Sequence, residues 1–574
     1  MILQWILVLT TAVLVHSGQI VHAPSGTFQG TFWKTKHDIT HNAFLGIPYA
    51  KPPVGERRFK PPEMIPPLEG VYDATEFKAF CIQINLLPPM HGLGPGEEDC
   101  LYLNIFSPES ADAAAGDLKS VFVFFHGGGN FNGQANIYNP GQLVTTQDII
   151  VVTVGYRLGY LGFLSTLSPG CEGNFGLKDQ ILSVAWVKEN IQAFGGDPGS
   201  ITIGGESAGA IDVSFLTIAS GTRNLFARAF SMSGLTGVQH PFIVRNAKST
   251  AIKVGRQAEC LKEGQPDPTS DEDFDRLVQC LREVPATVFG IEYTPAVPEL
   301  GPVEYGDLFP KKIEDLFNDE SYLHSLNFFE RDYLIGFDYN EGDIFTVMNN
   351  EVEKSLPEDV RKNLPPNGMF RGTVTHFLSS KFGPVSETVV SNVIDYYSSS
   401  YEVSPLADFA ADAIFHIPTF EWASAATRGL AMEDSKVHMF RFVHWPKFMA
   451  GPYKGMIHGT DLLYLFDLDP DFLKKIIDLH INGSLWGEED DYLKEKYISM
   501  VADFIKTGNP GLSVDPELPT PWLPFDQQEG HYLQFGITPE LKTQFKPERL
   551  FFWATQIPEW IEEYPVDQTT HTEL

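Results

Sequence analysis

Short, continuous apolar runs separated by helix-like stretches constrain the fold of this chain more than any other feature. Residues 120–125 read SVFVFF, and residues 148–154 read DIIVVTV. Runs of this length without polar alternation are typical of strands that are buried on both faces. Similar runs lie at residues 200–203, 333–337 and 437–445. Strands that alternate with helices predict an α/β fold, with a large, mostly parallel central sheet and helices on both faces.

The composition fits a globular protein and restricts its partners. Of 574 residues, 43% are hydrophobic and 13% are aromatic, which rules out a chain that is disordered throughout. The 74 acidic residues outnumber the 41 basic ones, for a formal net charge of −33. This charge argues against nucleic acid and anionic membranes as partners, because both require Lys and Arg at the contact. Residues 18–570 contain no obvious linker, so we expect a single domain.

Both ends of the chain resemble sorting signals. The apolar stretch from Ile2 to Val15 is shorter than the ~20 residues of a membrane-spanning helix, and it fits a signal peptide over residues 1–17. The alternative is a buried N-terminal helix. Residues 571–574 read HTEL and resemble the HDEL-type address of the endoplasmic reticulum, although a frayed acidic tail is the other interpretation. We expect a protein of the secretory pathway, in the reticulum lumen or secreted, without a transmembrane segment.

Two glycine-rich motifs predict nucleophilic chemistry. Residues 205–209 read GESAG and fit G-x-S-x-G, between a short Ile-Thr-Ile strand and an apolar helix. In such a turn the hydroxyl of Ser207 projects from the sheet, and a side chain two residues away on either side would clash with the backbone. Residues 126–129 read HGGG and directly follow an apolar run. Their amides suit an oxyanion hole, whereas a phosphate-binding loop would require Lys with Ser or Thr.

Further motifs follow in a recognisable order: FLGIPYA at 44–50, EDCLYLN at 98–104, YRLG at 156–159, NFGL at 174–177 and FGGDP at 194–198. With them the sequence resembles the type-B carboxylesterase/cholinesterase family over nearly the whole mature chain. The resemblance implies an α/β-hydrolase fold and hydrolysis of carboxylic esters by a Ser-Glu-His triad. It implies neither a metal nor a cofactor.

The resemblance also assigns roles to individual residues. Ser207 is the expected nucleophile, Glu341 is the acid within residues 336–342, and His458 is the base within residues 455–461. Both of the latter follow predicted strands, and active-site residues of open α/β sheets lie beyond the carboxyl ends of strands. Without the resemblance they would be one acid among 74 and one histidine among 16. The expected oxyanion donors are the amides of Gly128, Gly129 and Ala208.

Structural features follow from the same resemblance. It pairs four of the five cysteines as Cys81–Cys100 and Cys260–Cys280. The remaining Cys171 is interpreted as a small buried thiol rather than a reactive one. Two partly buried ion pairs are expected, Arg58 with Glu98 and Arg157 with Asp179. The sequence Asn-Gly-Ser at Asn482 predicts a glycosylation site in a luminal chain.

Some positions depart from the family pattern. Asn130 follows HGGG, where many relatives carry an apolar or aromatic residue, so we expect a more polar acyl-side pocket. Glu206 stands where juvenile hormone esterases typically carry Gln, which argues against that assignment. The loop from Ile82 to Asp99 contains no Trp, Tyr or Phe, whereas cholinesterases carry a Trp there that holds the choline group. We therefore expect a carboxylesterase rather than a cholinesterase.

The leading hypothesis is a serine carboxylesterase that hydrolyses small to medium lipophilic esters through an acyl-enzyme. Xenobiotic, hormone, pheromone or odorant esters fit this class. A non-catalytic esterase-like recognition protein is the first alternative, and the intact triad and the absence of a membrane stalk argue against it. A lipase or cholesterol esterase on the same fold is the second, and the sequence does not exclude it. The physiological ester and the oligomeric state stay open.

Overall fold

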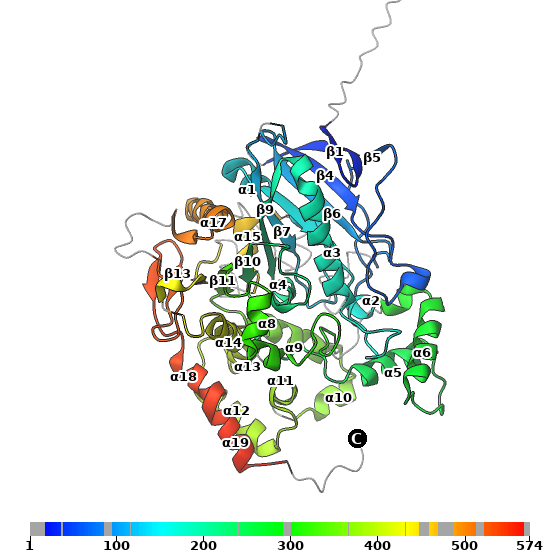
Figure 1. Cartoon of the computed structure of the whole chain (residues 1–574). Helices are drawn as coiled ribbons and strands as arrows, with labels where there is room; N and C mark the ends of the chain where they lie inside the picture. Colours follow the sequence, from blue (N-terminus) through cyan, green and yellow to red (C-terminus); the bar gives the residue numbers. More distant parts are fainter. Residues whose placement is uncertain are drawn as a thin grey trace, which may run out of the picture.

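A computed structural model describes most of the chain between residues 18 and 566 (Figure 1). The described residues are 18–35, 38–84, 95–114, 116–237, 240–290, 300–365, 367–430, 432–446, 458–468, 486–512 and 522–566. The expected signal peptide, Asn482 and the HTEL tail lie outside these residues. No helix among the described residues combines the length and the apolar character that a membrane crossing requires.

The centre of the molecule is an eleven-stranded sheet. Its strands, from one edge to the other, are β14 (Glu540–Lys542), β13 (Tyr532–Phe535), β12 (Val437–Phe442), β11 (Asp332–Asp338), β10 (Arg228–Met232), β9 (Gly196–Glu206), β7 (Lys119–Phe125), β8 (Ile150–Val154), β6 (Tyr102–Pro108), β4 (Thr40–Pro48) and β3 (Thr31–Lys34). Every neighbouring pair from β13 to β8 is parallel, and both edges are antiparallel. The mostly parallel sheet that the apolar runs predict is thus confirmed.

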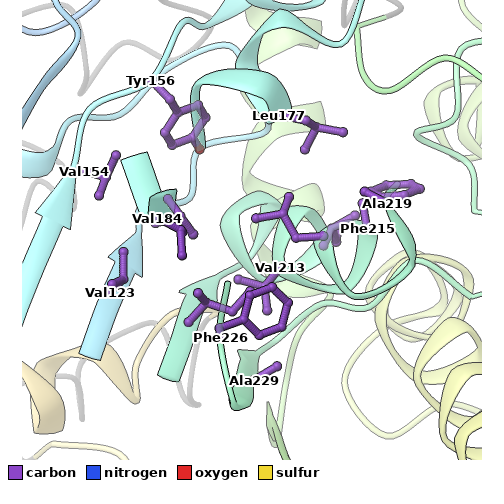
Figure 2. Packing of buried hydrophobic residues seen from close by; sticks show 14 of the residues in the cluster. Val123, Val154, Tyr156, Leu177, Val184, Val213, Phe215, Ala219, Phe226 and Ala229 are labelled. Atoms are coloured by element: carbon purple, nitrogen blue, oxygen red, sulfur yellow. The ribbon is translucent and has the colours of Figure 1, made fainter. Parts of the chain in front are cut away.

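Helices cover both faces of the sheet, and strand β7 shows why. Val121, Val123 and Phe125 pack in one apolar cluster with residues of α3 (Phe175–Asn190) and α4 (Ala208–Ile218). Figure 2 shows part of this packing, with Val123 of β7 and Val213 and Phe215 of α4 among the buried side chains. The alternate residues, Phe122 and Phe124, belong to a second cluster with α1 (Gly141–Gln147) and α17 (Glu488–Thr507). Both sets of side chains are buried, which explains the continuous apolar run.

Other elements surround this frame. A small sheet is formed by β1 (Ile20–Ala23), β2 (Gly26–Gln29) and β5 (Val71–Asp73). The other α-helices of the described residues with at least six residues are α5 (Ala247–Gln257), α6 (Asp271–Glu283), α8 (Glu320–Ser325), α9 (Asp343–Ser355), α10 (Glu358–Asn363), α11 (Gly368–Phe382), α12 (Glu387–Ser399), α13 (Pro405–Ala410), α14 (Ile417–Ala426) and α19 (Ile557–Glu563). The shorter ones are α2 (Gly159–Phe163), α7 (Ile313–Phe317), α15 (Leu462–Leu465) and α18 (Pro547–Phe551). Two π-helical turns occur in the described part of the chain: Ala411–His416 lies between α13 and α14, and Phe552–Gln556 lies between α18 and α19.

All five predicted strands are present, and their boundaries differ most from the predicted ones in β9 and β12. Strand β9 extends beyond the predicted residues 200–203 in both directions, because Gly204 and Gly205 still pair with β10 and β7. Strand β12 ends at Phe442, before the predicted end at residue 445. His444 lies beyond it and pairs with Asp490 at 2.7 Å.

Candidate active site

Ser207 occupies a strained turn between β9 and α4. Its backbone has φ 56° and ψ −124°, a region that residues with a side chain rarely adopt. Its amide donates to the carbonyl of Met232 at 2.9 Å, and its carbonyl accepts from Ile211 at 2.9 Å. These bonds fix the turn on both sides, so the strain is maintained by the neighbouring strand and by the helix that follows.

The glycines on either side of Ser207 are required by close backbone contacts. A Cβ atom on Gly205 would lie 2.5 Å from the carbonyl carbon of Gly209. A Cβ atom on Gly209 would lie 2.2 Å from the carbonyl oxygen of Phe125 in β7. Real Cβ atoms do not approach so closely, so both positions exclude any side chain. The G-x-S-x-G spacing therefore follows from the packing of β9, β7 and α4.

His458 and Glu341 meet at the carboxyl ends of the strands. Glu341 follows β11, and its Oε2 lies 2.6 Å from His458 Nδ1. The other oxygen, Oε1, accepts a hydrogen bond from the amide of Asp338 at 2.6 Å. Glu341 is completely buried, and the side chain of His458 is 7% exposed. The carboxylate therefore fixes the ring and selects the tautomer with hydrogen on Nδ1.

The second ring nitrogen of His458 lies beside Glu206, the residue that precedes Ser207. His458 Nε2 lies 3.2 Å from Glu206 Oε1 and forms no hydrogen bond within the described part of the chain. The hydroxyl of Ser207 donates no hydrogen bond to this atom in the structure. The side chain of Glu206 also lies against Gly127, where a Cβ atom would lie 2.4 Å from Glu206 Oε2. Of the two contacts expected of His458, the one with Glu341 is present.

Two more buried carboxyl groups lie behind this pair. Asp338 Oδ2 accepts from the amide of Thr460 at 3.0 Å. This bond joins the end of β11 to the segment that carries His458. Asp461 Oδ2 accepts from the hydroxyl of Tyr497 at 3.0 Å. No described Lys or Arg forms an ion pair with either Asp338 or Asp461. Burial and, to a smaller extent, the charge of nearby Glu341 together raise the pKa of Asp461 to about 7.

Glu206 and Glu341 control the charge of His458. Burial alone lowers the pKa of the imidazole, but Glu206 and Glu341 oppose it and raise the pKa to about 9. Burial raises the pKa of Glu206 to about 7, against the attraction of His458. An imidazolium at this position is therefore stabilised on both ring nitrogens.

One contact of His458 could not be anticipated from the sequence. The ring of Phe415 lies 4.6 Å from the imidazole, centroid to centroid, at an interplanar angle of 38°. Phe415 belongs to the π-helical turn Ala411–His416, and it is only 3% exposed. A π-helical turn has no strong sequence signature, so no motif marks this residue.

The predicted oxyanion donors lie next to the serine turn. Gly128 and Gly129 have φ values of +111° and +63°, which explains the glycines. Ala208 is the first residue of α4, where amides have no partner within the helix. Within the described residues, no loop or cap hydrogen bond uses the amides of Gly128, Gly129 or Ala208. All three amides are therefore available to an incoming oxygen.

The expectation for Asn130 is wrong. We predicted that this residue makes the acyl-side pocket more polar. Its side chain instead points inward, and Nδ2 donates to Asp212 Oδ1 on α4 at 2.9 Å. The residue is only 5% exposed. A partner 82 positions away along the chain leaves no local signal, so the sequence could not reveal this orientation.

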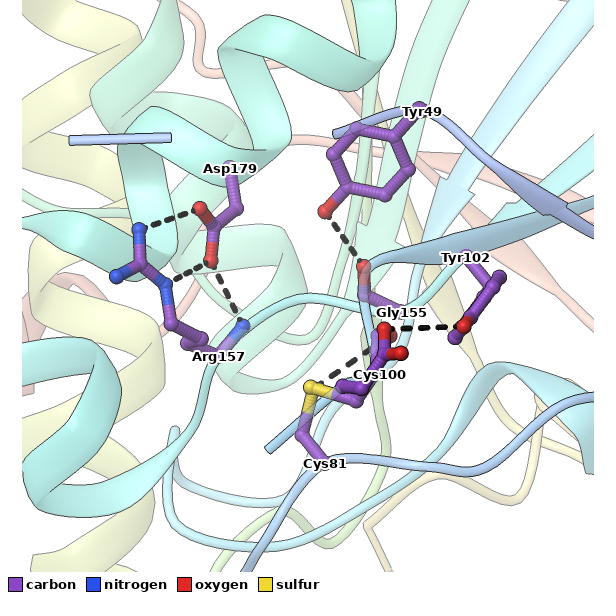
Figure 3. Close-up of a disulfide and its surroundings, with 8 residues drawn as sticks. Tyr49, Cys81, Cys100, Tyr102, Gly155, Arg157 and Asp179 are labelled. Atoms are coloured by element: carbon purple, nitrogen blue, oxygen red, sulfur yellow. Dashed lines mark hydrogen bonds and ion pairs between the residues drawn. A yellow bond between two sulfur atoms is a disulfide. The ribbon is translucent and has the colours of Figure 1, made fainter. Parts of the chain in front are cut away.

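The first disulfide and one ion pair support the serine-bearing end of the sheet (Figure 3). Cys81 and Cys100 are bonded, and Tyr49 donates from its hydroxyl to the carbonyl of Gly155 at 2.8 Å. Arg157 donates two hydrogen bonds to Asp179, at 2.8 Å from Nε and 2.7 Å from Nη2. Their side chains are 4% and 0% exposed. Such a fork-to-carboxylate contact is both strong and directional.

The other expected contacts are also in place. Arg58 donates two hydrogen bonds to Glu98, at 2.6 Å from Nε and 2.7 Å from Nη2. A second disulfide joins Cys260 to Cys280. Cys171 is free and buried, and burial raises the pKa of its thiol to about 12. It is therefore protonated near neutral pH, as expected of an unreactive thiol.

An open, mostly parallel sheet that ends in a serine turn of this kind is the α/β-hydrolase fold. Within that class the chain belongs to the carboxylesterase family, whose model matches residues 17–553. It is a carboxylic ester hydrolase.

Curated relatives agree over nearly their full length. Carboxylesterase 1C of Rattus norvegicus is 31% identical over 553 residues, or 92% of this chain and 91% of the relative. The cocaine esterase of Oryctolagus cuniculus is 30% identical over 94% of this chain and 95% of the relative. Pyrethroid hydrolase Ces2e of Rattus norvegicus is 30% identical over 96% and 92%, respectively.

Proposed function

We propose that this ester hydrolase works through Ser207, His458 and Glu341, and that it acts on small to medium lipophilic carboxylic esters. The observation that carries the proposal is the 2.6 Å contact between Glu341 and His458. It leaves Nε2 of the same ring without a hydrogen bond, close to the strained serine turn. A base with one nitrogen fixed by a carboxylate and the other close to the serine turn is what a serine nucleophile requires.

The first half of the reaction forms an acyl-enzyme. Nε2 of His458 accepts the proton of the Ser207 hydroxyl as the oxygen attacks the ester carbonyl. The amides of Gly128, Gly129 and Ala208 donate to the oxyanion that develops, and one such donor is worth roughly 3 kcal/mol. His458 then returns the proton to the leaving alcohol. Water repeats the sequence on the acyl-enzyme and releases the acid.

The carboxylates contribute by stabilising the charged imidazole. Glu341 holds Nδ1 and stabilises the positive ring in the transition state. Glu206 lies 3.2 Å from Nε2 and adds to this stabilisation. The same charges raise the pKa of His458, which makes the imidazole a stronger base. They also keep the ring protonated up to a higher pH, so activity is lost as the pH falls.

The direct test compares the wild-type chain with Ser207→Ala on p-nitrophenyl esters of graded acyl length. We expect the variant to lose at least about 10³-fold in kcat, because the nucleophile is gone, and to keep its fold. Pre-steady-state release of p-nitrophenol, equal to one per enzyme, is expected of the wild type alone. A Ser207→Ala variant with wild-type turnover would contradict the proposal.

The names of the relatives support a broad range of esters. One is called a cocaine esterase and another a pyrethroid hydrolase. We extend such breadth to this chain as a proposal, with neutral lipophilic esters as the main class. The acyl-length series above tests it, since a narrow preference for long chains would favour a lipase instead.

We further propose that residues 18–570 form one domain that enters the secretory pathway and is retained by residues 571–574. Strands from Thr31 to Lys542 share one sheet, and the two disulfides suit an oxidising compartment. Deletion of the last four residues should move the protein into the medium. Digestion with an N-glycosidase should lower the mass of the wild type but not of Asn482→Gln.

A further inference from the structure

Asp212 is a buried carboxyl group close to the candidate site that the proposed mechanism does not use. It lies on α4, five residues after Ser207, and is 0% exposed. Its Oδ1 accepts from Asn130 Nδ2 at 2.9 Å, and its Oδ2 accepts from Gln180 Nε2 at 2.7 Å. No described Lys or Arg forms an ion pair with it. Two neutral amides are therefore its only polar partners within the described residues.

Asn130 belongs to the loop that carries two of the oxyanion amides. Its backbone is left-handed, with φ 61°, which is uncommon for a residue with a side chain. Its carbonyl accepts from the amide of Gly159 at 2.7 Å. At the start of the loop, the hydroxyl of Tyr156 donates to the carbonyl of His126 at 2.6 Å. The side chain of Asn130 adds a further attachment, and it is the one that reaches α4.

The attachment of Asn130 to α4 has a geometric consequence. Ser207 and Ala208 are fixed to α4, whereas Gly128 and Gly129 belong to the loop after β7. The bond between Asn130 and Asp212 ties the loop to the same helix that carries the nucleophile. Burial raises the pKa of Asp212 to about 7, and the bonds from Asn130 and Gln180 oppose this rise. Both amides thus favour the ionised form, which makes the stronger acceptor.

We propose that Asp212 is a positioning residue that, through Asn130, fixes the position of the oxyanion amides of Gly128 and Gly129 relative to Ser207. The proposal rests on the proposed function, because it concerns the oxyanion hole of that site. It implies that loss of the bond lowers transition-state stabilisation more than substrate binding. Oxyanion donors act only when the tetrahedral oxygen is formed, so kcat should fall while KM stays.

The test is Asn130→Ala, compared with Gln180→Met as a matched control. Each removes one amide donor to the same buried carboxylate, but only Asn130 lies on the loop that carries Gly128 and Gly129. With p-nitrophenyl butyrate we expect Asn130→Ala to lower kcat by about 10- to 100-fold, with KM within about threefold. Its inhibition constant for a trifluoromethyl ketone should rise by the same factor. Gln180→Met should lower the melting temperature but keep kcat within about threefold.

An exchange of the two side chains guards against simple misfolding. Asn130→Asp alone would set two carboxyl groups against each other, so we expect at least a 100-fold loss of kcat. Asn130→Asp combined with Asp212→Asn restores a donor facing an acceptor, and an acceptor for Gln180. The combined variant should recover most of the lost kcat. A folded combined variant without recovery would overturn the proposal.

The remaining outcomes separate this proposal from the proposed function. Inactive Ser207→Ala together with Asn130→Ala of unchanged kcat would overturn the positioning role alone. Equal losses of kcat in Asn130→Ala and Gln180→Met would also overturn it, because the effect would then be one of general stability. Ser207→Ala with wild-type turnover would overturn both the proposed function and this proposal.

Discussion

The chain buries carboxylates in two different ways. Beside the first disulfide, Glu98 and Asp179 each meet an arginine with two short hydrogen bonds. Around His458, Glu206 and Glu341 meet one imidazole, and no arginine or lysine of the described chain pairs with them. The arginine-paired carboxylates fix segments of the frame to one another. The carboxylates at the candidate site instead shift the pKa of the group they surround.

The largest effect should come from Glu341→Gln. The amide keeps the size of the side chain but cannot hold His458 in the tautomer with hydrogen on Nδ1, so we expect a loss of about 10⁴-fold in kcat. Stability should change by less than about 1.5 kcal/mol, because the substituted group still forms hydrogen bonds. Steady-state kinetics and urea unfolding of one preparation give both numbers. A variant that is unfolded rather than inactive would break the comparison.

Asp179→Asn should show the opposite profile. It leaves Arg157 buried without a matching charge, which costs about 3–5 kcal/mol of unfolding free energy. The kcat of the folded fraction should stay within about threefold, because Asp179 contacts none of the proposed catalytic residues. Urea unfolding measures the unfolding free energy, and active-site titration gives the concentration of folded enzyme from which kcat is calculated. If stability is unchanged, the pair is not the brace that its geometry indicates.

How far the sequence could predict this contrast depends on the range of each interaction. The five apolar runs predicted strands correctly, because burial on both faces is a local property of a short segment. The arginine pairs and the disulfides came from family motifs. The contact of Glu206 with His458 joins residues 252 positions apart in the chain, and only the resemblance, not any local pattern, brought His458 to that site. Asn130 was misjudged for the same reason, since its partner Asp212 lies on another element.

A smaller effect is expected in the pH profile. His458 has a pKa raised to about 9, and it must be neutral to accept the serine proton. The value of kcat/KM should therefore fall as the pH decreases through this range, well above the ordinary imidazole value. Glu206→Gln removes one of the carboxylates that raise the pKa, so the acid limb should move to lower pH by about one unit. The exposed Glu109→Gln serves as control, and an unshifted profile for Glu206→Gln would show that Glu206 does not act on the ring.

The smallest effect concerns charged substrates. If the carboxylates of Glu206 and Glu341 attracted cations, a choline ester would be preferred over a neutral ester of similar size. The loop closed by Cys81 and Cys100 contains no aromatic residue that could hold the ammonium group by a cation–π contact. We expect kcat/KM for butyrylcholine to be no more than that for a neutral butyrate ester. A preference of about tenfold or more, equal to about 1.4 kcal/mol, would contradict this reading.

The residue after Glu341 restricts how such an enzyme could be altered by evolution. A Cβ atom on Gly342 would lie 1.7 Å from the carbonyl oxygen of Ala407 in α13, which is followed directly by the π-helical turn that carries Phe415. Any side chain at residue 342 would push that helix away from the imidazole. Libraries that diversify the acid loop should therefore recover Gly342 in every active clone. New substrate preferences would have to arise from positions elsewhere around the site.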